Sequence, residues 1–123
     1  MTLIEVLIAL FVFAIGALAI AAMTFMSIQG NSLSNRMTQA SLMAQDKMEE
    51  LMSSQDLTLI PLNTDHVEAN IDSEGVAGGS YTRNWVATGL GPTAASRWVS
   101  VEVSWNDAKG DHRVVIRSLW KAL

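Results

Sequence analysis

Cysteine is absent from the 123 residues of this chain, and no lysine or arginine occurs before Arg36. Without cysteine there is no disulfide, no thiol nucleophile and no cysteine-based metal site. Acidic residues outnumber basic ones by 12 to 8, which gives a net charge of −4. A mildly acidic chain without a basic stripe argues against nucleic-acid binding, because contacts to phosphates need clustered lysine and arginine.

Motifs for catalysis are lacking as well. The two histidines, His66 and His112, are far apart and have no catalytic partner at a recognisable spacing. The sequence contains no glycine-rich nucleotide loop, no G-x-S-x-G and no H-E-x-x-H. We therefore expect a protein that is not an enzyme, with no catalytic residue, no cofactor and no bound metal.

The longest apolar segment lies at the N-terminus. It runs from Val6 to Ile28, directly after Glu5, and its main polar interruptions are the hydroxyls of Thr24 and Ser27. Such hydroxyls can bond back to the backbone of a helix in lipid. Because about 20 apolar residues are enough to cross a bilayer core of about 30 Å, the run predicts a membrane-spanning helix over residues 1–28.

The helical pattern does not stop at the end of this run. No proline interrupts it before about Ser53, so the whole helix would be roughly 75–80 Å long at about 1.5 Å per residue. In its second half, residues 29–53, apolar side chains recur at three- and four-residue steps and form one stripe: Leu33, Met37, Ala40, Ala44, Met48 and Leu51. Polar side chains fill the other faces: Asn35, Gln39, Asp46, Lys47, Glu49 and Glu50. We expect the stripe to pack on whatever sheet follows.

Residues 54–79 are predicted to be a connecting loop, because turn-forming residues such as Pro61 and Asn63 recur through them. Several acids in this stretch could offer oxygen ligands to calcium: Asp65, Glu68, Asp72 and Glu74. Their spacing matches no EF-hand loop, and solvated turn chemistry is the simpler interpretation.

Three strand signals follow within residues 80–121, at positions 80–88, 97–105 and 112–120. In the second, Val99, Val101 and Val103 alternate with polar residues, so one face of the strand is apolar. The segment from Asn106 to Asp111 is typical of a hairpin turn between the last two strands. The predicted fold class is therefore α+β: a long N-terminal helix whose second half packs on a small antiparallel β-meander, in a globular domain of residues 29–123.

Glu5 is the one charged residue of the apolar N-terminal segment. In one interpretation it lies at the level of the lipid head groups and favours the positive end of the helix dipole. In the other it binds a cationic partner in an assembly, because an acid within a membrane helix is a functional candidate by default.

The segment Thr2-Leu3-Ile4-Glu5-Val6-Leu7-Ile8-Ala9-Leu10, followed by a continuous apolar helix, resembles the mature N-terminus of the type IV pilin superfamily. This family includes major and minor pilins and the pseudopilins of type II secretion. The resemblance implies a short basic leader, cleaved by a prepilin peptidase that also methylates the new N-terminal amine, here at Met1. Positive charges beside a membrane helix set its orientation, and the chain has none before Arg36. This absence agrees with a leader that carried those charges and was then removed. Met1 stands where phenylalanine is commonest in the family.

The resemblance also implies how the chain assembles. Glu5 would meet the N-terminal amine of a neighbouring subunit, and Thr2, Leu3 and Ile4 would belong to the same assembly segment. The subunit would wait in the bacterial inner membrane as a single-pass protein with a periplasmic C-terminal domain. Its partners would be other pilin or pseudopilin subunits and an inner-membrane assembly platform, and the product would be an extracellular pilus or a periplasmic pseudopilus.

Three alternatives stay open at this point. The segments 44–51 and 101–107, with the small size of the chain, most resemble PilV-type minor pilins and GspI-type pseudopilins. The chain could instead be the main subunit of a thin pilus. A rival from another class is a bitopic membrane protein that never polymerises and displays a periplasmic binding module, but Glu5 and the missing N-terminal bases argue against it.

Overall fold

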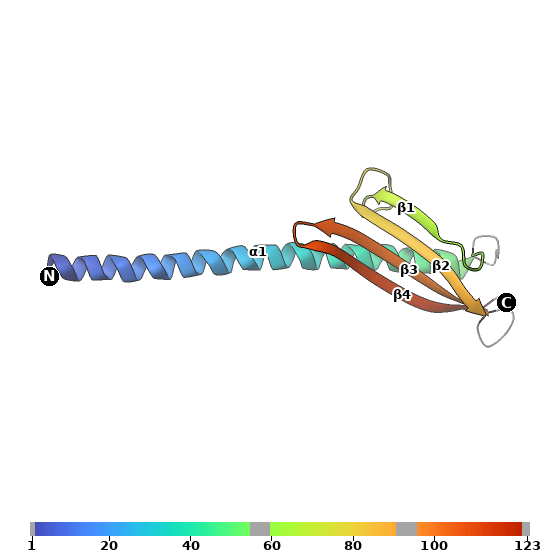
Figure 1. Ribbon diagram of the computed structural model, residues 1–123, viewed down its shortest axis with the longest axis horizontal. Helices are drawn as coiled ribbons and strands as arrows, with labels where there is room; N and C mark the ends of the chain where they lie inside the picture. The colour runs from blue at the N-terminus through green and yellow to red at the C-terminus, as the bar shows by residue number, and fades with distance from the viewer. Residues whose placement is uncertain (1, 55–59, 91–95, 122–123) are drawn as a thin grey trace. The chain divides into compact units, whose positions relative to one another are not determined.

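The protein has an α+β fold in which a long N-terminal helix is followed by a four-stranded antiparallel sheet, as the computed structural model shows (Figure 1). The structure describes residues 2–54, 60–90 and 96–121. Its elements are, in order, α1 (Leu3–Ser53), β1 (His66–Ile71), β2 (Tyr81–Leu90), β3 (Ser96–Asp107) and β4 (Gly110–Lys121). The predicted fold class is confirmed.

The sheet is a meander in which each strand pairs with the next one along the chain, in the order β1-β2-β3-β4. The hairpin between β3 and β4 has the turn predicted from the sequence, since Asp107 pairs with Gly110 and only two residues lie between them. Gly110 has a φ of 122°, a conformation that glycine adopts without steric cost.

Strand β1 lies inside the segment 54–79 that was predicted to be a connecting loop, so that prediction is wrong for residues 66–71. His66 and Glu68 pair with Trp85 and Arg83 of β2, on the side of the sheet that carries the core. Because these inward-facing residues of β1 are polar, the apolar alternation that predicts a strand is missing here. A register shift at the end of β1 weakens the pattern further.

The described chain divides into two compact units, Met1–Arg36 and Met37–Leu123, so the second unit begins later than the predicted domain start at residue 29. In the second unit, part of α1 packs on one face of the sheet. The buried apolar residues of this core are Ala40, Met43, Ala44, Met48, Leu51, Ile60, Ile71, Tyr81, Ala87, Val99, Val101, Val103, Trp105 and Trp120. Fully burying one valine stabilises a fold by about 1.5–3 kcal/mol, so the three β3 valines alone make a large contribution.

Two polar contacts bind the helix to the sheet at opposite ends of the core. The hydroxyl of Tyr81 donates a hydrogen bond to Oε1 of Gln39, at 2.8 Å. The indole N–H of Trp120 donates to the carbonyl oxygen of Ser54, at 3.1 Å. Each bond satisfies the polar atom of a buried aromatic side chain, which allows the ring to contribute its full apolar area.

The packed face of the helix differs from the predicted stripe. Met37 is about half-exposed, whereas Met43 and Lys47 are buried together with Ala40 and Ala44. Sequence periodicity placed Lys47 on a face other than the packed stripe, and this assignment is wrong because Lys47 is buried and its ammonium has partners inside the domain. Trp98 is 46% exposed, on the outer face of the sheet, whereas Trp105 and Trp120 are buried in the core.

Candidate functional site

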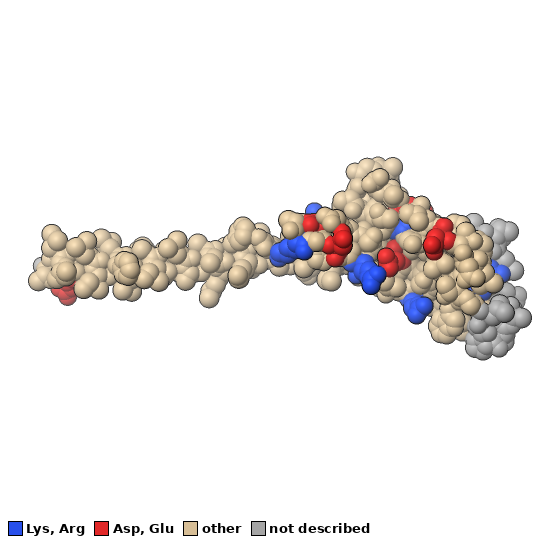
Figure 2. All heavy atoms as spheres, viewed as in Figure 1, with Lys and Arg blue, Asp and Glu red and all other residues tan. Residues whose placement is uncertain are grey.

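The N-terminal part of α1, from Val6 to Ile28, presents a largely apolar surface. From Leu3 to Ile28 its large hydrophobic side chains are exposed, and no charge occurs between Glu5 and Arg36. Figure 2 shows charged atoms gathered over the part of the chain that carries the sheet, apart from one acidic group at the N-terminal end. This helix is long and apolar enough to span a membrane.

Glu5 and Thr2 close the first turn of the helix. The backbone N–H of Thr2 lies 3.4 Å from Oε2 of Glu5, and the carbonyl oxygen of Thr2 accepts from the N–H groups of Glu5 and Val6. A glutamate that reaches back to the N-cap in this way forms one half of a capping box, and its charge favours the positive end of the helix dipole. Glu5 is nevertheless exposed, and 3.4 Å is a long hydrogen bond, so the carboxylate is open to a further partner.

Of the predicted assembly residues, the structure brings Thr2 and Glu5 together. Leu3 and Ile4 point into open space, with Leu3 81% exposed. Met1, the predicted site of methylation, lies outside the described residues.

Thr24 is a polar interruption of the apolar run that the helix itself satisfies. Its hydroxyl donates to the carbonyl oxygen of Ile20 at 2.9 Å, one turn earlier. A hydroxyl that donates to the helix backbone in this way leaves no unsatisfied donor to face the lipid. The polar atom therefore does not prevent this face of the helix from lying in an apolar environment.

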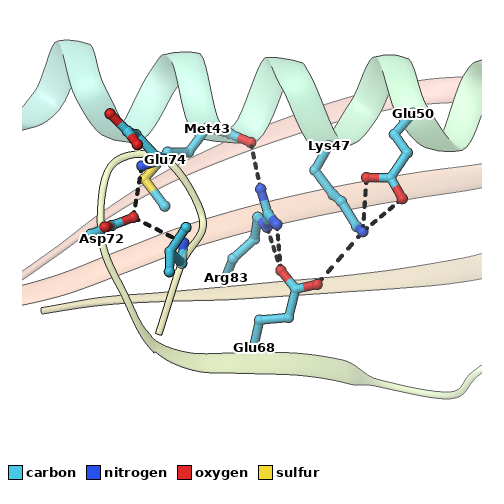
Figure 3. Close-up of polar contacts among 8 residues, drawn as sticks. Met43, Lys47, Glu50, Glu68, Asp72, Glu74 and Arg83 are labelled. Atoms are coloured by element: carbon cyan, nitrogen blue, oxygen red, sulfur yellow. Dashed lines mark hydrogen bonds and ion pairs between the residues drawn. The ribbon is translucent and has the colours of Figure 1, made fainter. Parts of the chain in front are cut away.

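In the second unit, a cluster of charged side chains joins the helix to the sheet (Figure 3). The ammonium of Lys47 binds Glu50 at 3.0 Å and lies 3.6 Å from Oε1 of Glu68. The guanidinium of Arg83 binds the other oxygen of Glu68 from Nε and Nη2, at 2.7 and 2.5 Å, and it also donates to the carbonyl oxygen of Met43 at 3.4 Å. Glu68 thus bridges two cations, one from α1 and one from β2.

Sequence reasoning missed this cluster because it treated the charges of each segment separately. A signal was present, since Lys47 lies three residues after Ala44 and four before Leu51, on the same helical face. The cluster is a structural connection between helix and sheet, because both its cations are already bound.

Comparisons with protein-family models, curated proteins and solved structures find no match for this chain. Its function must therefore be argued from its own residues.

Two of the acids considered as calcium ligands, Asp72 and Glu68, serve other purposes in the structure. Asp72 accepts hydrogen bonds from the N–H groups of Glu74 and Val76, both at 2.9 Å, and so shapes the turn after β1. Glu68 is held by Lys47 and Arg83. Within residues 2–54, 60–90 and 96–121, no three histidine or acidic side chains gather as a metal-binding group.

The two histidines each stack on a tryptophan. His66 lies parallel to Trp85 with ring centroids 5.2 Å apart, and His112 stacks on Trp105 at 5.3 Å. Nε2 of His112 is also 3.1 Å from Asp107, across the hairpin. These contacts are those of rings packed at the edges of a core.

Proposed function

We propose that this chain is a subunit of a helical filament of the type IV pilin superfamily, either a pilus or a type II secretion pseudopilus. It is held in the inner membrane by the N-terminal part of α1 before assembly and is extracted from lipid into the filament. Its partners are further pilin or pseudopilin subunits, a prepilin peptidase and an assembly platform. Its small domain favours a minor pilin or pseudopilin over the main subunit of a thin pilus.

The observation that carries this proposal is the place of Glu5. It is the only charged residue before Arg36, and it lies in the first turn of a helix whose following apolar surface is exposed. In a helix that served only as an anchor, this acid would gain the capping contact with Thr2 and the favourable end of the helix dipole, but burial of its unpaired charge in lipid would be costly.

Assembly in or near lipid needs a specific attraction, because one apolar helix gains little by leaving lipid tails for another apolar helix. A carboxylate at position 5 and the amine of a neighbouring subunit's residue 1 supply one. At an effective dielectric constant near 20, two charges about 4 Å apart attract by about 4 kcal/mol. A subunit docked out of register would leave Glu5 unpaired in an apolar environment, so the pair also selects the register.

The decisive experiment is to purify pili and pseudopili from cells that express this chain and to measure its ratio to the dominant subunit. We expect the chain to be present at a small fraction of the dominant subunit. Near parity would remove the minor-subunit assignment and leave the main subunit of a thin pilus. Retention of the whole population in the inner membrane would contradict the proposal and favour a bitopic protein with a periplasmic binding module.

A further inference from the structure

The basic residues of the Met37–Leu123 unit fall into two groups. Lys47, Arg83 and Arg97 are turned inward, where Lys47 and Arg83 bind carboxylates and Arg97 donates to the carbonyl oxygen of Ile60. All the others lie on β4 or in the turn that leads into it: Lys109, Arg113, Arg117 and Lys121. An acidic domain therefore carries its outward-facing positive charge on one strand.

This charge borders an exposed apolar patch on the outer face of the sheet, the face turned away from α1. Trp98 of β3 pairs directly with Leu119 of β4, and both are exposed, as is Val115. Thr88, Trp98 and Arg117 line a shallow hollow of about 240 Å³ at this patch. We call the surface formed by Trp98, Val115, Leu119, Arg113 and Arg117 the outer sheet patch. Glu102 of β3 lies within it, opposite Val115, and one of its carboxylate oxygens is 3.9 Å from Arg113 in an exposed ion pair.

A complementary surface lies on α1. Leu42 is 53% exposed, and Asp46 and Glu49 follow it on the same exposed side, at i+4 and i+7. Neither acid forms an ion pair with another residue in the described part of the chain. We call Leu42, Asp46 and Glu49 the helix stripe.

The outer sheet patch and the helix stripe cannot meet within one molecule. The buried residues of α1, such as Ala40 and Ala44, contact the sheet face that carries Val99 and Val101, so the helix stripe faces away from the sheet. The outer sheet patch lies on the opposite face of the same sheet. The two surfaces therefore point in opposite directions, and only another molecule can join them.

We infer that the outer sheet patch of one copy binds the helix stripe of a second copy of this chain. Leu42 occupies the hollow beside Trp98, and Asp46 and Glu49 lie against Arg113 and Arg117. Each copy keeps one unused patch and one unused stripe, so the contact is heterologous and repeats along a row of molecules. It is separate from the N-terminal helix contacts of the proposed function and stands without them.

The contact is weak for isolated domains, because exposed ion pairs contribute little and the apolar patch is small. A membrane or a filament holds the copies together and raises their effective concentration, which allows a weak contact to form. A different role for the arginines is protection of β4, an edge strand, against pairing with another sheet. If the arginines bind the helix stripe, removing them should lower the yield of dimer. If they protect the edge strand, removing them should raise it.

Cysteine crosslinking of the full chain tests the contact, since the native sequence has no cysteine to compete. One preparation carries Leu42→Cys and another Leu119→Cys, and both are placed in the same phosphatidylcholine vesicles and oxidised. We expect a disulfide-linked dimer in the mixture and little in either preparation alone. The matched control replaces Leu42→Cys by Val76→Cys, an exposed position in the turn between β1 and β2, and should give only background.

Charge reversal gives the second arm of the test. Arg113→Glu with Arg117→Glu in the Leu119→Cys chain should lower the dimer yield about fivefold, as expected for loss of exposed pairs. When the Leu42→Cys chain also carries Asp46→Lys and Glu49→Lys, its dimer yield with this charge-reversed Leu119→Cys chain should be restored.

Four results would overturn the inference. A mixed dimer no more abundant than the Val76→Cys control shows that the surfaces do not meet. Equal dimers from each preparation alone show an isologous contact. A yield that rises when the arginines are replaced by alanine assigns them to edge protection. The last result uses phosphatidylglycerol vesicles that contain few copies of the Leu119→Cys chain. If its thiol is shielded there from a water-soluble thiol reagent, the patch binds anionic lipid instead.

Discussion

The ammonium of Lys47 lies over the indole ring of Trp85, 4.3 Å from the ring centroid, in the middle of the interface between α1 and the sheet. Only 9% of the Lys47 side chain is exposed, so its charge depends on this ring and on the carboxylates of Glu50 and Glu68. A cation enclosed in this way gains more from the aromatic face than an exposed one does. One lysine thus connects the helix with both β1 and β2.

Replacing Lys47 by alanine should destabilise the domain by about 2 kcal/mol, because it removes the cation from two carboxylates and leaves a cavity beside Trp85. For a domain of this size that corresponds to a fall of roughly 10 °C in melting temperature. Thermal melting of the full chain in mild detergent, followed by tryptophan fluorescence, measures it. Lys47→Met is the matched control and should lose less than half as much, since the methionine keeps the apolar stem. Equal losses in both variants would show that the charge contributes and the packing does not.

A fragment that begins at Gln29 should fold as a monomer at micromolar concentration, because the second half of α1 and the sheet close one core. Met48→Asp or Val103→Asp should unfold it, since an unpaired buried charge costs several kcal/mol, a large part of a small domain's stability. Circular dichroism and tryptophan fluorescence of the purified fragment report the outcome.

The control for these core variants is Val115→Asp. Val115 lies on the neighbouring strand but faces outward and is about half-exposed, so its replacement should leave the melting temperature almost unchanged. If Val103→Asp melts like Val115→Asp, the assignment of inner and outer faces is wrong.

The inner face of β3 could be predicted from the sequence because its valines alternate with polar residues, and the burial of Val99, Val101 and Val103 confirms it. Strand β1 could not be predicted, because the residues it turns toward the core are His66 and Glu68. Their burial is made possible by partners distant in the chain, Trp85 and Arg83. Periodicity detects an apolar face, and it does not detect a polar face that is neutralised by tertiary contacts.

Gly79 is a position at which even a methyl group should not fit. The N–H groups of Gly78 and Gly79 both donate to the carbonyl oxygen of Asn70, so the turn folds back closely on the end of β1. A Cβ atom at Gly79 would overlap the backbone of Ile71 and Asp72. Gly79→Ala should therefore destabilise the domain by about 2–3 kcal/mol.

Chemical denaturation of the full chain, followed by tryptophan fluorescence, tests the Gly79 prediction. Ser73→Ala, an exposed position in the same turn, provides the comparison and should change little. A Gly79→Ala chain as stable as Ser73→Ala would mean that the turn can open without cost.

Glu5→Gln should leave membrane insertion and domain folding intact and reduce incorporation into filaments by about tenfold or more, because the pairing charge is lost. Glu5→Lys should be worse, since it places two cations together. Quantitative immunoblotting of sheared filaments and of the membrane fraction measures both variants, with Glu74→Gln as an exposed control acid. Normal incorporation of Glu5→Gln would show that charge pairing does not drive assembly of this protein.

The mature N-terminus should carry one methyl group on its amine, as expected for a chain processed by a prepilin peptidase. Mass spectrometry of the intact native protein and of its N-terminal peptide measures this directly. A functional protein that retains an uncleaved leader would contradict the assignment to the pilin superfamily.

In the candidate site, Glu5 could be predicted from the sequence because it is a single acid directly before a long apolar run. The capping contact between Thr2 and Glu5 follows from their spacing, although only the structure shows it. The helix stripe follows from the i+4 and i+7 spacing of its residues in the sequence. The outer sheet patch does not, because its residues come from two strands and form one surface only when β3 and β4 are paired.

The order of the strands also determines when the domain can close during synthesis. Each hairpin is local, so β1 to β4 can form one after another as the chain emerges, as in other folds of low contact order. The buried residues of α1 are covered only by strands made later, and Trp120 of β4 reaches back 66 residues to bond Ser54. Until the last strand is made, the apolar side of the helix is therefore not fully covered. A chain that ends before Trp120 would lack both this hydrogen bond and the apolar area of the buried indole.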